Sequence, residues 1–259
     1  MTEIHGVSLA ALRDQGALPS SHHCVYLSGS LVRGWGNALS DVDVYVITDE
    51  DWSSPTAEQG HVALEPDTLP VEIRYVDGRR WDIEYWRETQ IDQVLAKVDW
   101  SVLDGSKAAG NRLSSDELYF LERLSYAAAV SGDDWLRARK EQLEKSAMRS
   151  VLVARSLNNA DTYTQDVIGQ LEAGDVESAV LSTKIAFGHA VDALVAAAGE
   201  YGLNPKWRAR RFRAAAPGLL TFEEYWSVEN MHRYDPSNPR AWVEEALEIC
   251  QRISLEVSI

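Results

Sequence analysis

Short apolar runs alternate with turn residues through the first hundred residues of the chain. Alternation with a period of two is typical of β-strands, whereas apolar positions three or four residues apart are typical of helices. The segment LPVEIRYVDGRRWDIEYW reads as two strands joined through Asp77 and Gly78, the dipeptide that most favours a tight hairpin turn. The pattern predicts strands at 24–29 and 42–48, a hairpin at 69–86, and helices at 8–15 and 88–98.

Helical periodicity dominates the sequence after DGSKAAGNRLSSDE, a stretch with the character of a linker. Acidic residues after Gly132 suit the start of a helix, and Gly174 and Gly202 suit helix ends. Helices are predicted at 116–130, 134–157, 162–172 and 176–202. We therefore expect an α+β domain with a mixed β-sheet flanked by helices over residues 1–108, followed by an α-helical bundle over residues 109–259.

Composition places the chain among globular proteins. At 259 residues and 45% hydrophobic content, it can bury two modest cores. Cys24 and Cys250 are too few for a disulfide framework or a zinc cluster, so both are predicted to be buried. The first residues lack a basic leader, and no apolar stretch reaches the length of a membrane span without polar residues. We expect a cytoplasmic protein with no membrane partner.

The charge balance narrows the class of partner. Forty acidic and 25 basic residues give a formal charge of -15, which repels a phosphate backbone. Nucleic acid is therefore not expected as a partner, and a terminal transferase acting on RNA is disfavoured. A cationic small molecule would be attracted. The basic segment KWRARRFR leaves room for a local anion site.

Two aspartates lie one residue apart in the apolar segment DVDVYVI. Strand alternation puts Asp41, Asp43 and Tyr45 on one face and valines on the other. Carboxylates this close repel each other and raise each other's pKa unless a cation lies between them, and Mg²⁺ prefers such oxygen ligands. The alternative is a solvated edge strand or an Asx turn at Ser40-Asp41, against which the apolar valines and the Gly-Ser pair upstream argue.

A Gly-Ser pair precedes the aspartates and suggests a phosphate site. Gly29 at a strand end allows close approach of a ligand, and the N–H groups of the following turn together with the Ser30 hydroxyl can donate to phosphate oxygens. Phosphate donors and metal ligands so near in sequence suggest a metal-bound triphosphate. A third carboxylate on an adjacent strand would complete a site for two Mg²⁺ ions.

The segment GSLVRGWGNALSDVDVYVI, with ten residues between Gly-Ser and Asp-Val-Asp, resembles the signature of the DNA polymerase β-like nucleotidyltransferase superfamily. It is most similar to the small-molecule branch, which includes the kanamycin and streptomycin/spectinomycin nucleotidyltransferases. The resemblance implies transfer of a nucleoside monophosphate, such as AMP from ATP, to a hydroxyl of a small acceptor such as an aminoglycoside. It further implies that Asp41 and Asp43 hold Mg²⁺ and that Gly29 and Ser30 bind the triphosphate.

The hairpin offers candidates for the third carboxylate. Asp82 and Glu84 share a strand face, and the resemblance favours Asp82 as the metal ligand and leaves Glu84 as a candidate general base. Glu72 on the neighbouring strand is a third choice. The alternative for Asp82 and Glu84 is the solvated face of a hairpin, with arginines nearby as ion-pair partners.

Other candidates have more open interpretations. Arg33 either contacts the nucleotide or braces the loop against Asp41, and Trp86 either stacks on a base or sugar or packs in the core. Lys184 and Asp192 lie on one helix face and are interpreted as ligands of nucleotide phosphate and of the acceptor, or as a structural salt bridge or a solvent-facing stripe. Lys206 is a second phosphate candidate. A catalytically silent nucleotide-binding or toxin–antitoxin-type protein is the alternative function.

Overall fold

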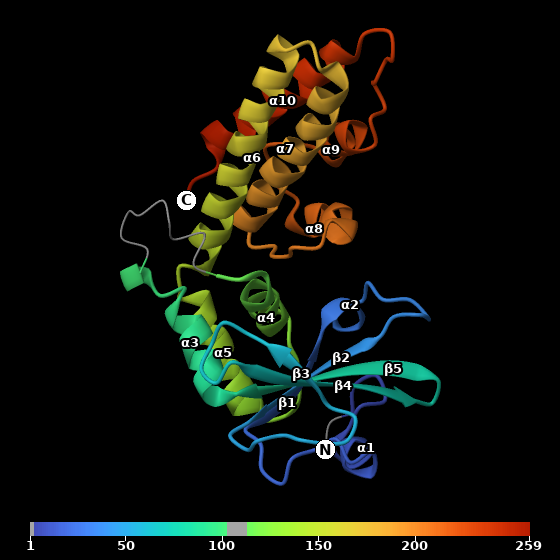
Figure 1. Cartoon of the computed structure of the whole chain (residues 1–259), viewed down its shortest axis with the longest axis vertical. Coiled ribbons are helices and arrows are strands. Elements are labelled where there is room, and N and C mark those ends of the chain that lie inside the picture. Colours follow the sequence, from blue (N-terminus) through green and yellow to red (C-terminus); the bar gives the residue numbers. More distant parts are fainter. Residues whose placement is uncertain (1–2, 103–112) are drawn as a thin grey trace. The chain divides into compact units, whose positions relative to one another are not determined.

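The computed structural model describes residues 3–102 and 113–259, and these form two compact units (Figure 1). Unit 1 contains the described residues up to Ser146, and unit 2 contains residues 147–259. Each unit has its own cluster of buried apolar side chains. The fold class expected from the sequence, a mixed β-sheet flanked by helices with a helical C-terminal region, is confirmed.

Unit 1 is built on a six-stranded sheet with the order β3-β4-β5-β2-β1-β6. The pairing of β2 with β5 is parallel, and the other described pairings are antiparallel. The strands are β1 (Cys24–Ser28), β2 (Val42–Thr48), β3 (Glu58–His61), β4 (Thr68–Val76), β5 (Arg79–Arg87) and β6 (Ala128–Ser131). The helices are α1 (Leu9–Asp14), α2 (Gly29–Val32), α3 (Glu88–Ala96), the 3-10 turn η1 (Trp100–Val102), α4 (Ser115–Ser125) and α5 (Asp133–Glu144).

The sheet has one apolar face and one face that carries polar chemistry. Val42, Val44 and Val46 are buried in a cluster that includes Leu12 of α1, because every second side chain of β2 points to this side. Asp43 and Tyr45 point to the opposite face, where Tyr45 stacks on a tyrosine of β1. Helix α4 contributes to this second face through a ring contact between its Phe120 and Trp86 of β5. The alternation predicted for β2 is therefore confirmed.

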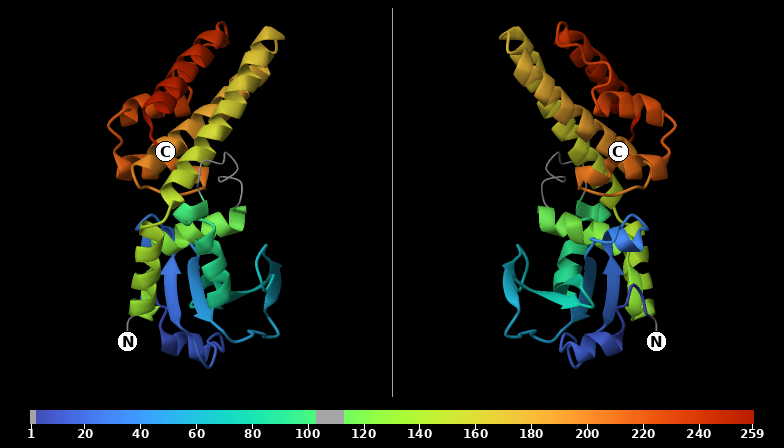
Figure 2. Two further views of the ribbon diagram at one scale, coloured as in Figure 1. Left: turned by 90° about the vertical axis from the view of Figure 1, so that its left-hand side faces the viewer. Right: turned by 90° about the vertical axis from the view of Figure 1, so that its right-hand side faces the viewer.

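Unit 2 is a helical bundle, in which α6, α7 and α10 lie side by side in both views of Figure 2. Its elements are α6 (Met148–Glu172), α7 (Val176–Ala197), the 3-10 turn η3 (Pro205–Trp207), α8 (Arg208–Ala215), α9 (Phe222–Glu229) and α10 (Pro239–Glu256). Helix α7 begins at a cap, where Asp175 accepts a hydrogen bond of 3.1 Å from the Ser178 N–H. Helix α7 is long and apolar enough to cross a membrane, but 72% of its most apolar stretch of 18 residues is buried within the protein.

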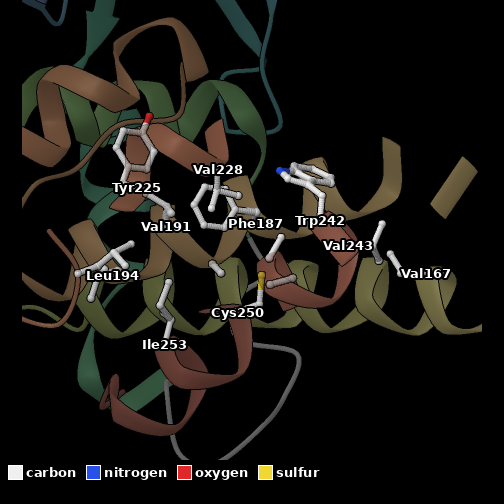
Figure 3. Close-up of a cluster of buried hydrophobic side chains, with 14 of the residues drawn as sticks. Val167, Phe187, Val191, Leu194, Tyr225, Val228, Trp242, Val243, Cys250 and Ile253 are labelled. Atoms are coloured by element: carbon white, nitrogen blue, oxygen red, sulfur yellow. The ribbon is translucent and has the colours of Figure 1, made fainter. Parts of the chain in front are cut away.

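Large apolar and aromatic side chains fill the centre of unit 2 (Figure 3). Phe187 of α7 faces Tyr225 of α9 with their ring centroids 6.2 Å apart, and Trp242 of α10 is 2% exposed. Cys250 is buried in the same cluster, and Cys24 is buried in unit 1, so the prediction for both cysteines is confirmed. Burial of these large side chains supplies most of the driving force for packing the bundle.

The structure corrects the predicted domain boundary and four of the predicted helices. The boundary at 108/109 lies outside the described residues, but the described residues 113–146 belong to unit 1. The predicted helix 116–130 ends at Ser125. The chain then forms β6, which pairs with the edge of β1 that does not pair with β2. The predicted helix 134–157 is interrupted after Glu144, and its second half continues without a break through 162–172 as α6. The predicted helix 176–202 ends at Ala197, and the glycine with positive φ after it is Gly199, not the predicted Gly202. Strand β3 was not expected from the sequence.

Candidate active site

Strands β2 and β5 bring acidic side chains together on the polar face of the sheet. Asp43 is the register partner of Asp82, and Tyr45 is the partner of Glu84. The pKa of Asp43 is raised to about 6, mainly by burial; Arg123 opposes this rise, and the charges of Asp41 and Asp82 contribute to it. The three aspartates predicted as metal ligands therefore interact electrostatically across two adjacent strands.

Gly29 gives the backbone a close approach to this carboxylate set. Its φ of +81° is in the left-handed region that favours glycine, and it starts α2 directly after β1. A Cβ atom at this position would lie 1.9 Å from Oδ2 of Asp43 and 3.1 Å from Nη1 of Arg123. No larger residue fits here without displacing Asp43. The predicted turn at the Gly-Ser pair is confirmed, and its role in binding phosphate stays a prediction.

Arg123 is a residue of this site that the sequence analysis missed. It lies on α4, with its Nη2 atom 3.7 Å from Oδ1 of Asp43 and its side chain 26% exposed. Its backbone carbonyl accepts a hydrogen bond of 2.7 Å from the Ser28 hydroxyl, so α4 is joined to the end of β1 next to Gly29. The signal in the sequence is a lone arginine in the largely apolar run LYFLERLS, which the predicted boundary at 108/109 places in the other domain.

Glu84 and Trp86 lie together on β5, at a cavity of about 360 Å³ that also contacts Asp43. The Trp86 indole N–H donates a hydrogen bond of 2.8 Å to Glu84, and its ring lies 4.3 Å from that of Phe120. Burial is the main cause that raises the pKa of Glu84 to about 7, and the charge of Asp43 adds to the effect. Trp86 is 1% exposed, so it forms part of the core as well as a wall of the cavity.

Two of the carboxylates, Asp43 and Asp82, are paired with arginines in this structure. Asp82 accepts a hydrogen bond of 2.6 Å from Nε of Arg80, which lies two residues earlier on the same face of β5. Among residues 3–102 and 113–259, no group of three or more His, Cys, Asp and Glu side chains is arranged to hold a metal ion. The donor types nevertheless suit Mg²⁺, and Arg80 is 45% exposed, so Asp82 can exchange this arginine for an ion at modest cost.

The structure excludes Glu72 as the third carboxylate of this set. Glu72 is the register partner of Ile83, so its side chain lies on the opposite face of the sheet from Asp82 and Glu84. It is fully buried and accepts hydrogen bonds from Arg74, at 2.8 and 3.0 Å, and from the Trp52 indole at 3.1 Å. Glu72 is therefore a structural ion-pair residue.

The remaining predicted residues have contacts of different kinds. The Arg33 guanidinium lies between two rings, 3.6 Å from the centroid of Trp35 and 3.8 Å from that of Tyr126. This cation–π packing accounts for the side chain without a nucleotide, and a role in nucleotide binding stays a prediction.

In unit 2, Asp192 accepts hydrogen bonds of 3.0 Å from Nε and Nη2 of Arg208 and of 2.8 Å from Arg211. These contacts favour the structural salt bridge that the sequence left open for Asp192. Lys184 and Lys206 are both exposed, and their predicted contacts with phosphate stay predictions.

No protein-family model matches the sequence, and no curated protein matches it. Among solved structures, the chain is similar to a protein from Exiguobacterium sibiricum 255-15 described as nucleotidyltransferase-like. The two chains are 14% identical with a TM-score of 0.49, over 94% of this chain and 72% of that chain. This degree of likeness assigns neither a family nor a substrate to the chain.

Proposed function

We propose that the protein is a Mg²⁺-dependent nucleotidyltransferase that transfers AMP from ATP to a hydroxyl group of a small molecule and releases pyrophosphate. One observation carries the proposal: the backbone of Gly29 lies so close to the Asp43 carboxylate that any side chain at position 29 would collide with it. A metal-bound triphosphate requires backbone N–H groups next to metal-binding carboxylates, because its phosphate oxygens contact both the N–H donors and the metal ion.

Each residue of the site has a role in this proposal. Asp41, Asp43 and Asp82 would hold two Mg²⁺ ions, which when bound activate the attacking oxygen and neutralise charge on the leaving group. Gly29 and Ser30 would bind the β- and γ-phosphates. Arg123, beside Asp43, compensates part of the negative charge of the set. The resemblance of the sequence suggests an aminoglycoside as one class of acceptor to test.

The transfer exchanges one bond for another. The acceptor oxygen forms a bond to the α-phosphorus, the bond from that phosphorus to the bridging oxygen breaks, and pyrophosphate leaves with the electron pair. The acceptor proton passes to a base, for which Glu84 is placed beside Asp82 on the same strand face. In-line displacement requires the acceptor oxygen and the pyrophosphate to lie on opposite sides of the α-phosphorus.

The test is Mg²⁺-dependent release of pyrophosphate from ATP in the presence of a panel of hydroxylated acceptors. Asp43→Asn is expected to lower the rate at least about 100-fold. This exceeds the loss expected from removing a residue that only hydrogen-bonds to a metal ligand. The matched control is Asp49→Asn, which removes the same charge just beyond the other end of β2, where the side chain is 63% exposed. Binding of Mg²⁺·ATP without turnover on any acceptor would favour the alternative function, a catalytically silent nucleotide-binding protein. In that case Asp43 and Asp82 would stay paired with Arg123 and Arg80.

A further inference from the structure

Apolar and aromatic side chains make up more than half of the lining of the cavity beside the carboxylates. Its charged or titratable lining residues are Asp43, His61, Glu84, Asp116 and Arg123. Among the lining residues, Trp86 and Phe120 are 1% and 2% exposed, and Tyr119 of α4 is 37% exposed. Leu69 and Val71 of β4 line the side toward the edge of the sheet. At about 360 Å³, the cavity lies near the lower end of the range for small-molecule sites.

The order of the strands decides which reactant this cavity takes. Gly29 follows β1, and the cavity is lined by residues of β5, β4 and β3, on the other side of β2. If the β- and γ-phosphates lie at Gly29, the α-phosphorus lies near Asp43 between the two regions. An in-line attack then comes from the side opposite Gly29, which is the side of Glu84 and the cavity. The cavity therefore faces the acceptor.

The chemistry of the walls limits the acceptor. A compound with several ammonium groups would lose their hydration against Trp86, Phe120 and Leu69, and buried charge without a partner is costly. In the proposed function Asp43 binds the metal and Glu84 receives the acceptor proton, which leaves Asp116 as the carboxylate of the lining that could pair with an ammonium group. Asp116 is exposed, so solvent would screen such an ion pair and it would offset little of the cost. An aromatic ring, in contrast, gains burial and ring contacts along these walls.

We propose that the acceptor is a small, uncharged compound with a hydroxyl group on, or one or two carbons from, an aromatic ring. This inference rests on the proposed function and names its substrate class. The ring would lie between Tyr119 and Val71, and the hydroxyl would point to Glu84. The same chemistry is present in a free aromatic alcohol or phenol and in a tyrosine side chain of a protein, so the experiment must distinguish these sources.

The experiment first measures binding of Mg²⁺·ATP to the full chain by calorimetry and then AMP transfer by mass spectrometry of each acceptor. The probes are 4-hydroxyphenylethanol for a free compound, N-acetyltyrosine amide for a tyrosine side chain, and kanamycin and glycerol as polar acceptors. We expect an AMP adduct on at least one aromatic probe, with kcat/KM at least about tenfold above both polar acceptors. The better aromatic probe identifies the source.

The outcomes separate the two proposals. Absence of Mg²⁺·ATP binding would contradict the proposed function itself. Binding of Mg²⁺·ATP with preferred transfer to kanamycin or glycerol, or with transfer to neither aromatic probe, would overturn the aromatic acceptor and leave the nucleotide site standing.

Variants of the cavity wall provide the second test. Tyr119→Ala removes an exposed ring from α4 and is expected to raise the KM for the aromatic probe about tenfold, with the affinity for Mg²⁺·ATP unchanged. Val71→Phe narrows the cavity from the β4 side and is expected to raise that KM as well. The control is Tyr75→Ala, which removes a 72% exposed tyrosine of β4 outside the cavity. Equal KM values in Tyr119→Ala, Val71→Phe and the control would contradict the proposed placement of the ring.

Discussion

Replacing Asp43 by Asn is expected to stabilise the metal-free protein at alkaline pH while abolishing its nucleotide chemistry. Burial raises the pKa of Asp43 from 3.8 to about 6, so the ionised carboxylate is disfavoured in the folded state. Since one pH unit corresponds to about 1.4 kcal/mol, this difference amounts to roughly 3 kcal/mol. The side chain is 20% exposed, which lets solvent screen part of the penalty. We therefore expect Asp43→Asn to raise the free energy of unfolding of the metal-free protein by about 1–2 kcal/mol at alkaline pH.

The sign of the pH dependence follows from the direction of the pKa. Because the folded state binds the proton of Asp43 more tightly than the unfolded state, the stabilising contribution is complete below pH 3.8 and is lost as pH rises through about 6. Asparagine has no such proton. The wild-type protein should therefore lose roughly 1 kcal/mol of unfolding free energy relative to Asp43→Asn between pH 5 and pH 8.

The assay is chemical unfolding of both proteins at a series of pH values in a chelating buffer, followed by circular dichroism and tryptophan fluorescence. Asp14→Asn is the control for the loss of one carboxylate, since Asp14 is exposed and lies in the same unit. Adding Mg²⁺ should raise the midpoint of the wild-type protein and not that of Asp43→Asn. A wild-type protein that gains stability over Asp43→Asn as pH rises would refute the reasoning, because attraction by Arg123 would then exceed the cost of burial.

Three further predictions test other contacts. Gly29→Ala places a methyl group 1.9 Å from Asp43 Oδ2 at positive φ, so thermal unfolding should show a loss of about 2 kcal/mol and calorimetry a loss of ATP binding. Glu72→Gln breaks a buried ion pair, so unfolding should show a loss of about 3 kcal/mol or more while Mg²⁺·ATP affinity per folded molecule is kept; lost affinity would contradict the face assignment. Gly188→Ala brings a Cβ within 3.0 Å of the Arg208 guanidinium, which offsets the gain of about 1 kcal/mol that Gly→Ala gives inside a helix, whereas Gly169→Ala has nothing within 4 Å and keeps that gain; unit 2 should therefore be less stable in Gly188→Ala than in Gly169→Ala, and equal midpoints would refute this packing.

Local patterns were sufficient to predict the elements that hold the acidic residues. The alternation of β2 and the Asp77-Gly78 turn depend only on neighbouring residues, and the structure has β2 at the predicted residues 42–48 and a hairpin between β4 and β5. The shared face of Asp82 and Glu84 follows from the same period of two. Their juxtaposition with Asp43 depends on the pairing of β2 with β5, which the sequence suggested only through the resemblance.

The spacing of apolar residues along the chain could not predict contacts between segments that are distant in the sequence. Ala128–Ser131 follows a helix and contains helix-forming alanines, but the free edge of β1 offers backbone hydrogen bonds that no local pattern reveals. This strand attaches α4 and α5 to unit 1, and with α4 comes Arg123. Asp192 could not be assigned from its helix face alone, because its partners Arg208 and Arg211 follow an intervening turn.

The central claim, that Asp43 and Asp82 with Gly29 form a metal-dependent triphosphate site, is tested most directly by calorimetric titration of ATP into the purified chain with and without Mg²⁺. The account predicts binding that requires Mg²⁺ and disappears in both Asp43→Asn and Asp82→Asn, while Asp49→Asn binds like wild type. Absence of ATP binding by the wild-type chain in the presence of Mg²⁺, or binding of equal affinity without the ion and in both site variants, would contradict it.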